Sequence, residues 1–179
     1  SDLGAASWSV IDDEDPRMAV VSQGGLFGYA DLEQGRLLLP PVYQDAGPFR
    51  EGLAVVRLGD RFGLIDRDGV WRIDCGRYDY VGPLSGGRAL VRRDGLYGFI
   101  DRHGREAIAV RYPFACRFHE GRAVVRIGDK YGYIDTEGRQ AIPPVFDRAY
   151  RFIGGKARVN RCGETFFIDK SDECWLKFD

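Results

Sequence analysis

Apolar and polar residues alternate in short runs along this chain, and the last run shows the pattern most plainly. Ala157 and Val159 are apolar, whereas the intervening Arg158 and Asn160 are polar. A period of two is typical of a β-strand with one buried face. The same Ala-x-Val pattern occurs upstream, and its apolar members are predicted to be core: Ala54, Val56, Ala89, Val91, Ala123 and Val125.

The opposite face of these predicted strands ends in an arginine in three copies, Arg57, Arg92 and Arg126. Stacked repeats would place the three side chains in a row. Two interpretations remain open for this row. It is either a solvated face whose aliphatic stems cover apolar surface, or a stripe that binds a partner.

A second run follows each Ala-x-Val run and begins with an aromatic–glycine step. It recurs every 34 or 35 residues and ends in Asp each time, which indicates that one small unit is copied along the chain. Residues rich in β-branched and aromatic types, bounded by Gly and Asp, predict a strand. The five copies are Phe27–Asp31, Phe62–Asp66, Tyr97–Asp101, Tyr131–Asp135 and the degraded Thr165–Asp169.

A turn and a third strand complete each unit. In Asp66–Gly69 the Asp side chain suits a bond to a backbone N–H two residues on, and Gly supplies a positive φ. The third strand leaves through a Pro-Pro-x-aromatic segment in two copies, at Pro40–Pro41 and Pro143–Pro144. Proline cannot donate a ladder hydrogen bond, so these pairs are expected at a strand end or sheet edge.

Together the patterns predict an all-β fold of tandem repeats, each a short three-stranded antiparallel unit, stacked as an open twisted β-array. A closed five-bladed propeller-like ring is the alternative, if strands near residues 8–12 and 174–178 pair with each other. The chain is read as a single domain, residues 1–179. It comprises an N-terminal cap at 1–17 and units near 18–49, 50–84, 85–118, 119–152 and 153–179.

At this level the chain resembles the WG-repeat family, also called KWG repeats, over roughly residues 18–179. The copy that carries the resemblance best is 129–138, which reads Lys-aromatic-Gly-x-Ile-Asp-x-x-Gly from residue 130. The Trp that names the family is Phe or Tyr in every copy here. The resemblance implies a β-rich bacterial repeat module that serves as an interaction unit, with no catalytic residue set to carry over.

Composition is typical of a soluble, ordered domain, with 44% hydrophobic and 30% charged residues. The net charge of −1 argues against nucleic acid as a partner, and no run is long enough for membrane insertion. We therefore expect a monomer that binds another protein. The sequence starts at Ser1 without Met, so a removed export signal is considered, and a periplasmic or secreted location is favoured over a cytoplasmic one.

Four cysteines permit three pairings. Cys162 and Cys174 fall in neighbouring predicted strands of the final unit, where a disulfide would secure the terminus. The cysteines also suit small buried positions of a reduced protein. Both interpretations stay open.

Candidate chemistry is thin, and no cofactor is expected. His103 and His119 occupy turn positions that hold other residues in other copies, and Cys116 near His119 lacks an orienting third group. The Asp series does not form a calcium loop, because the Asp-x-Asp-x-Asp-Gly pattern is absent. Neither a metal site nor a catalytic residue is predicted.

The leading hypothesis is a non-catalytic protein–protein interaction module. Its predicted partner-binding residues combine the arginine row with two turn acids and two aromatics unique to the second unit, which are equally suited to the core: Arg57, Arg92, Arg126, Glu51, Glu120, Trp71 and Tyr78.

Two alternatives belong to other classes. A carbohydrate or cell-wall binding module would use exposed aromatics at Tyr29, Phe99, Tyr133 and Phe167. A weak hydrolase would use scattered carboxylates such as Glu51, Asp66 and Glu120.

Overall fold

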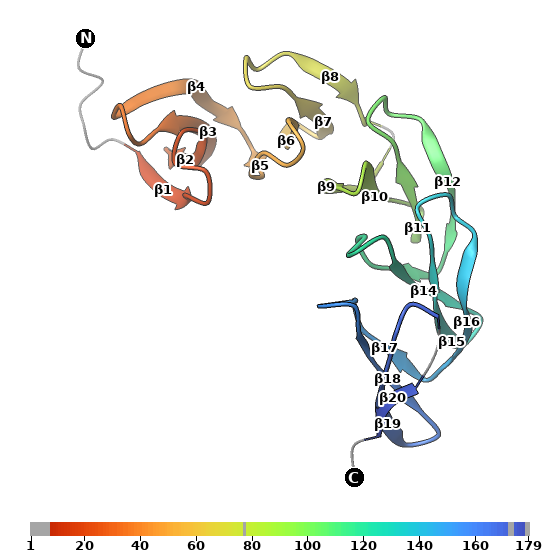
Figure 1. The fold of residues 1–179 in the computed structure, drawn as a ribbon. Helices are drawn as coiled ribbons and strands as arrows, with labels where there is room; N and C mark the ends of the chain where they lie inside the picture. The colour runs from red at the N-terminus through yellow and green to blue at the C-terminus, as the bar shows by residue number, and fades with distance from the viewer. Residues whose placement is uncertain (1–7, 77, 172–173, 178–179) are drawn as a thin grey trace. The chain divides into compact units, whose positions relative to one another are not determined.

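A computed structural model describes residues 8–76, 78–171 and 174–177, with backbone only for the last range. Over these residues the regular structure is entirely β (Figure 1). The strands form five four-stranded sheets, and within each sheet they follow one another in chain order. The predicted all-β repeat fold is confirmed. Among the described residues there is no helix long and apolar enough to cross a membrane.

The first two sheets belong to the N-terminal half. The first contains β1 (Ser9–Asp12), β2 (Ala19–Gln23), β3 (Leu26–Asp31) and β4 (Arg36–Tyr43). The second contains β5 (Asp45–Ala46), β6 (Ala54–Leu58), β7 (Arg61–Ile65) and β8 (Trp71–Asp74).

The other three sheets repeat the pattern. They are β9 (Tyr80–Ser85), β10 (Arg88–Arg93), β11 (Leu96–Ile100) and β12 (Glu106–Tyr112); β13 (Phe114–Ala115), β14 (Ala123–Ile127), β15 (Lys130–Ile134) and β16 (Gln140–Phe146); and β17 (Arg148–Ala149), β18 (Ala157–Arg161), β19 (Glu164–Ile168) and β20 (Cys174–Lys177).

Each sheet has one strand more than the three predicted for each sequence unit. The Ala-x-Val and aromatic–glycine runs form the second and third strands, and the segment before the aromatic exit forms the fourth. The additional first strand follows that exit and is as short as two residues, as in β13, where Phe114 pairs with Arg126 and Ala115 with Val125. Each of these sheets therefore begins a few residues before the corresponding sequence unit.

The two terminal strands form near the predicted positions and pair within their own sheets. β1 pairs with β2, and β20 pairs with β19. In the sheets built by the described residues, neither strand pairs with the other.

The chain divides into two compact units, which we call unit 1 (Ser1–Pro83) and unit 2 (Leu84–Asp179). In unit 1, the first sheet packs face to face on the second. The core between them comprises Met18, Val20, Tyr29, Tyr43, Phe49, Ala54, Val56 and Ile65.

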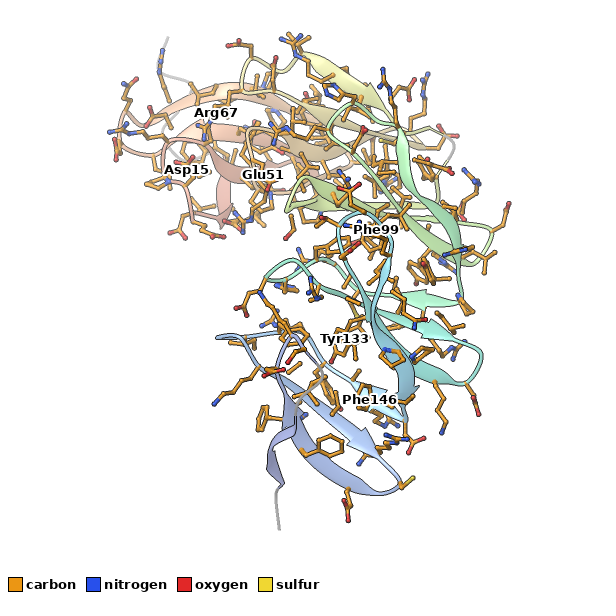
Figure 2. All side chains as sticks on the ribbon, turned by 45° about the vertical axis from the view of Figure 1, so that its right-hand side comes forward. Asp15, Glu51, Arg67, Phe99, Tyr133 and Phe146 are labelled. Carbon is orange, nitrogen blue, oxygen red and sulfur yellow. The ribbon has the colours of Figure 1, made fainter. Side chains whose placement is uncertain are left out.

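Unit 2 contains two such cores (Figure 2). One joins the sheets β9–β12 and β13–β16 and includes Leu90, Phe99, Tyr112, Phe118, Ala123 and Val125. The other joins β13–β16 to β17–β20 and includes Val124, Tyr133, Phe146, Phe152, Ala157 and Val159.

The Ala-x-Val residues are buried in every predicted copy, which confirms that face as core. The opposite face is more buried than alternation alone suggests. Leu90 and Val124 are 7% and 2% exposed, because that face packs against the following sheet. In the last sheet the equivalent position is Arg158, which is exposed.

The structure does not support the disulfide considered between Cys162 and Cys174. Cys162 is a free, exposed cysteine, and the side chain of Cys174 lies outside the described residues. Cys162 lies in the turn before Glu164, whereas Cys174 pairs with Ile168 at the far end of β19. Four residues of strand span about 13 Å, well beyond the Cα separation of about 4.4–6.8 Å that a disulfide requires.

Candidate functional site

The three arginines of the predicted row lie at equivalent places, near the end of the second strand of a sheet. Their surroundings differ. Arg57 of β6 donates from Nη1 to the carbonyl of Gly59 at 3.0 Å. Arg92 of β10 is exposed, and its guanidinium carbon lies 5.9 Å from the Tyr97 ring centroid. Arg126 of β14 is half-buried.

In unit 2 two of these arginines stand opposite aromatic residues in the strand register. The backbone register pairs Arg92 with Tyr97, and it pairs Arg126 with both Phe114 and Tyr131. Ring centroids are separated by 6.4 Å between Tyr97 and Phe114 and by 5.7 Å between Phe114 and Tyr131, both in edge-on geometry. These five residues, Arg92, Tyr97, Phe114, Arg126 and Tyr131, form what we call the aromatic–arginine ladder.

The ladder is accessible from solvent. Phe114 is 36% exposed, and Tyr97 and Tyr131 are half-buried. Aromatic rings and arginine are the side-chain types that are enriched where proteins bind one another.

No carboxylate among the described residues forms an ion pair with Arg92 or Arg126. Two cations that lie close to them in the sequence are paired. Arg93 contacts Glu106 at 2.7 Å, and Lys130 pairs with Asp147. The ladder therefore carries two positive charges that the described residues do not neutralise.

Arg126 also has a buried donor, a property that it shares with Arg122. Its Nε is inaccessible to solvent and has no hydrogen-bond partner, although the residue as a whole is half-buried. The exposure of Arg126 therefore lies at its other atoms. Burying the Nε donor of Arg126 without a hydrogen-bond partner costs free energy.

The ladder is not repeated at the equivalent positions of other sheets. In unit 1, Asp45 stands opposite Arg57 where Phe114 stands opposite Arg126. In the last sheet, Arg148 stands opposite Asn160, and Asn160 donates from Nδ2 to Thr165 Oγ1 at 3.2 Å. Arg57 also stands opposite an aromatic residue, Phe62, so what belongs to the β9–β12 and β13–β16 sheets is the continuous run of three rings with two arginines.

The predicted turn acids lie at left-handed positions. Glu51 has a φ of 53° and Glu120 a φ of 52°. Glu120 Oε1 accepts a hydrogen bond from the amide of Gly155 at 3.0 Å, so this carboxylate ties one sheet of unit 2 to the turn of the next. Its geometry indicates a structural role.

The two aromatics of the second unit belong to the interior. Tyr78 is 5% exposed, so its side chain does not offer a binding surface. Trp71 is half-buried and packs against the core of unit 1, with its ring over Gly63. The prediction that Tyr78 contacts a partner is wrong for this reason, and the core interpretation left open for both aromatics fits.

The aromatics considered for sugar stacking are also interior. Tyr29, Phe99 and Tyr133 are at most 1% exposed, and Phe167 is half-buried. The hydroxyl of Tyr29 donates to the carbonyl of Gly47 at 2.6 Å, and that of Tyr133 donates to the carbonyl of Tyr150 at 2.7 Å. Burial against the next sheet removes the surface on which the carbohydrate alternative depended.

The repeated aspartates cap turns. Asp101 Oδ1 accepts hydrogen bonds from the amides of His103 and Arg105 at 2.8 and 3.0 Å, and Asp135 Oδ1 accepts equivalent bonds from Glu137 and Arg139. Asp66 follows the same pattern and also accepts from Arg72. Of the carboxylates considered for hydrolysis, Asp66 is thus engaged by its own turn and Glu120 by the turn that contains Gly155.

The pKa shifts of these aspartates agree with a turn-capping role. Partial burial raises the pKa of Asp101, but the amides of Arg105 and His103 outweigh it, so its pKa lies below the ordinary value. The pKa of Asp66 and that of Asp135 are lowered by the same balance, with help from Arg72 and Arg139. A general acid needs a raised pKa, so these groups are poorly suited to one.

Cys116 and His119 do not form an activated pair. Burial raises the pKa of the Cys116 thiol and so disfavours the thiolate. Burial also lowers the pKa of His119, assisted by Arg151 and Arg117. No group of three or more metal-ligating side chains occurs in the part of the chain that the structure describes.

Sequence reasoning missed Phe114 as a surface residue. The available signal was variation among the copies, because the equivalent position holds Asp45, Tyr80, Phe114 or Arg148. An aromatic residue at a position that is elsewhere charged is expected at the surface rather than in a repeated core.

The fold and this surface define the chain as a β-repeat protein built from propeller-like four-stranded sheets. A family model described as "WG containing repeat" matches residues 27–61, 62–97, 97–131 and 131–161. The chain therefore belongs to the WG-repeat family, as its resemblance predicted. No curated protein matches it significantly.

Solved structures with similar folds are WD40-like. Hsv2 of Kluyveromyces lactis superposes with a TM-score of 0.56 at 8% identity, over 92% of this chain and 61% of that chain. The WD40 domain of SCAP from fission yeast gives 0.51 at 10% identity, over 95% and 55%. The chain thus spans about three-fifths of the length of these structures, and the likeness concerns the fold alone.

Proposed function

We propose that this chain is a non-catalytic protein-interaction module and that its partner binds at the aromatic–arginine ladder of unit 2. The observation that supports this most is an exposed ring, Phe114, that stands opposite Arg126, an arginine without a carboxylate partner among the described residues.

The repeat architecture suits this function. Sheets packed face to face hold the ladder residues on β-strands, so little side-chain and backbone freedom is lost when a partner docks. Arginine and aromatic side chains also supply most of the binding energy in protein interfaces.

The experiment is an affinity capture from source-cell extract with the whole chain as bait. The test variant is the double substitution Phe114→Asp and Arg126→Asn, which introduces the residue types that the chain itself holds at Asp45 and Asn160. We expect it to fold and to lose the captured protein.

The matched control is the double substitution Arg111→Gln and Arg158→Gln. Both arginines lie over tyrosine rings, at 5.1 Å from Tyr112 and 4.4 Å from Tyr150, but neither belongs to the ladder. Capture that is equal for the parent and both variants would reject the ladder as the site. Absence of any specific captured protein would count against the module.

A further inference from the structure

We propose that the ladder recognises an extended acidic peptide segment that carries carboxylates and apolar side chains on the same face. This inference rests on the proposed function and names the chemistry of the partner. It is carried by charge, by ring spacing and by the contrast between equivalent sheets.

Charge gives the first argument. Arg92 and Arg126 have no ion-pair partner among the described residues, and Asp147 of the same region is occupied by Lys130 and by the amide of Cys162. A carboxylate of a partner molecule could form the ion pairs that these two arginines lack. Arginine binds carboxylates with two parallel hydrogen bonds, which gives both strength and orientation.

Spacing gives the second argument. Successive rings of the ladder are 6.4 and 5.7 Å apart. Alternate side chains of an extended peptide lie about 6.5 Å apart, since each residue rises by about 3.3 Å. Because neighbouring side chains of an extended segment point to opposite faces, only every second side chain can face the ladder, and these can place apolar groups at the rings and carboxylates at the arginines.

The contrast between sheets gives the third argument. Asp45 in unit 1 stands opposite Arg57, so that sheet presents a carboxylate where the ladder presents Phe114. An acidic segment would be repelled there. The residue at this position therefore favours an acidic partner in the β13–β16 sheet, where it is Phe114, and disfavours one in the β5–β8 sheet, where it is Asp45.

The test measures fluorescence anisotropy of fluorescein-labelled synthetic peptides with the full chain. The first (Glu–Phe) peptide has seven residues, with Glu and Phe in turn at the odd positions and Ser at the even positions; the second replaces each Glu by Lys, and the third replaces each Phe by Ser. A labelled thymidine oligonucleotide of similar length tests nucleic acid as the occupant.

We expect the Glu–Phe peptide to bind at least about tenfold more tightly than either comparison peptide, and to weaken several-fold between about 50 and 300 mM salt. The Arg92→Gln and Arg126→Gln double variant and the Phe114→Asp variant should each raise Kd about tenfold. The Arg111→Gln and Arg158→Gln control should stay within about twofold of the parent. Thermal melts of every variant show whether a loss of binding reflects unfolding. The single variant Arg92→Gln is measured as well, because Arg92 is exposed and its substitution should not affect core packing.

Equal binding of the Lys–Phe peptide, preference for the oligonucleotide, or no peptide binding up to about millimolar concentration would overturn the acidic-segment proposal. An equal loss in the control would overturn the ladder as its site. If affinity capture succeeds and depends on Phe114 while the Glu–Phe peptide does not bind, the interaction module stands and only the partner chemistry is wrong.

Discussion

At the scale of single residues, glycines of the aromatic–glycine step fix how closely two strands approach. A Cβ on Gly98 would lie 2.7 Å from the carbonyl oxygen of Ile108 and from the Cα of Val110. A Cβ on Gly132 would lie 2.6 Å from the carbonyl oxygen of Ile142. Both neighbours are backbone atoms, which cannot swing aside as a side-chain end can.

We predict that Gly98→Val and Gly132→Val each lower the free energy of unfolding by at least about 2 kcal/mol, because the fourth strand must shift away from the third. Urea denaturation measures the change. Gly128→Asp is the control, since nothing lies within 4 Å of its Cβ position and Asp94 adopts a φ of 52° at the equivalent place. A Gly98→Val midpoint equal to that of the control would contradict the close approach.

At the scale of elements, the turn between the third and fourth strands depends on its aspartate. Asp101 accepts two amide hydrogen bonds, and Gly104, with a φ of 81°, closes the turn by donating to the Asp101 carbonyl at 3.1 Å. The amide bonds favour the ionised carboxylate, so folding depresses the pKa of Asp101. The pKa of Asp66 and of Asp135 is depressed similarly.

We predict that Asp101→Ala destabilises the fold by about 1 kcal/mol, whereas Asp101→Asn, which keeps an acceptor, costs less. A carboxyl whose pKa is depressed by folding stabilises the fold above its unfolded value of 3.8, and this stabilisation is lost as the pH falls through the folded value. Urea midpoints measured from neutral pH down to about pH 3 should therefore fall at the acid end for the parent.

The triple variant Asp66→Asn, Asp101→Asn and Asp135→Asn provides the comparison for this pH dependence. Its urea midpoint should fall less over the same acid range, because three of the groups that titrate have been removed. Identical pH profiles for the parent and the triple variant would show that these turns do not contribute.

At the scale of the whole molecule, the repeat limits how small a stable piece can be. A single four-stranded sheet buries neither face by itself, so its apolar residues need neighbours. Unit 2 contains two complete inter-sheet cores, and it also carries the whole ladder.

We predict that a fragment of residues 80–179, which retains all of β9, folds cooperatively and keeps the ladder's binding. Circular dichroism during thermal unfolding measures the first property, and affinity capture measures the second. A shorter fragment of residues 114–179 lacks Leu90 and Phe99, so it loses the core between the β9–β12 and β13–β16 sheets and should be less stable. A fragment 80–179 that folds but captures nothing would place part of the binding surface in unit 1.

The sequence by itself determined the all-β repeat, the Ala-x-Val core face and the capped Asp–Gly turns, because these depend on local periodicity and on residues that act within a few positions. Alternation cannot show whether a strand's second face meets solvent or another sheet. Only the tertiary structure decided that Leu90 and Val124 are buried, that Tyr29 and Tyr133 lie in the interior, and that a short strand such as β13 begins the next sheet.

The ladder depended on the tertiary structure for the same reason. Arg92 and Arg126 are visible in the sequence as equivalent residues, but Phe114 joins them only because β13 pairs with β14 and the neighbouring sheets stack. Long-range strand pairing and sheet packing bring these side chains together, and neither is set by the residues adjacent in the chain.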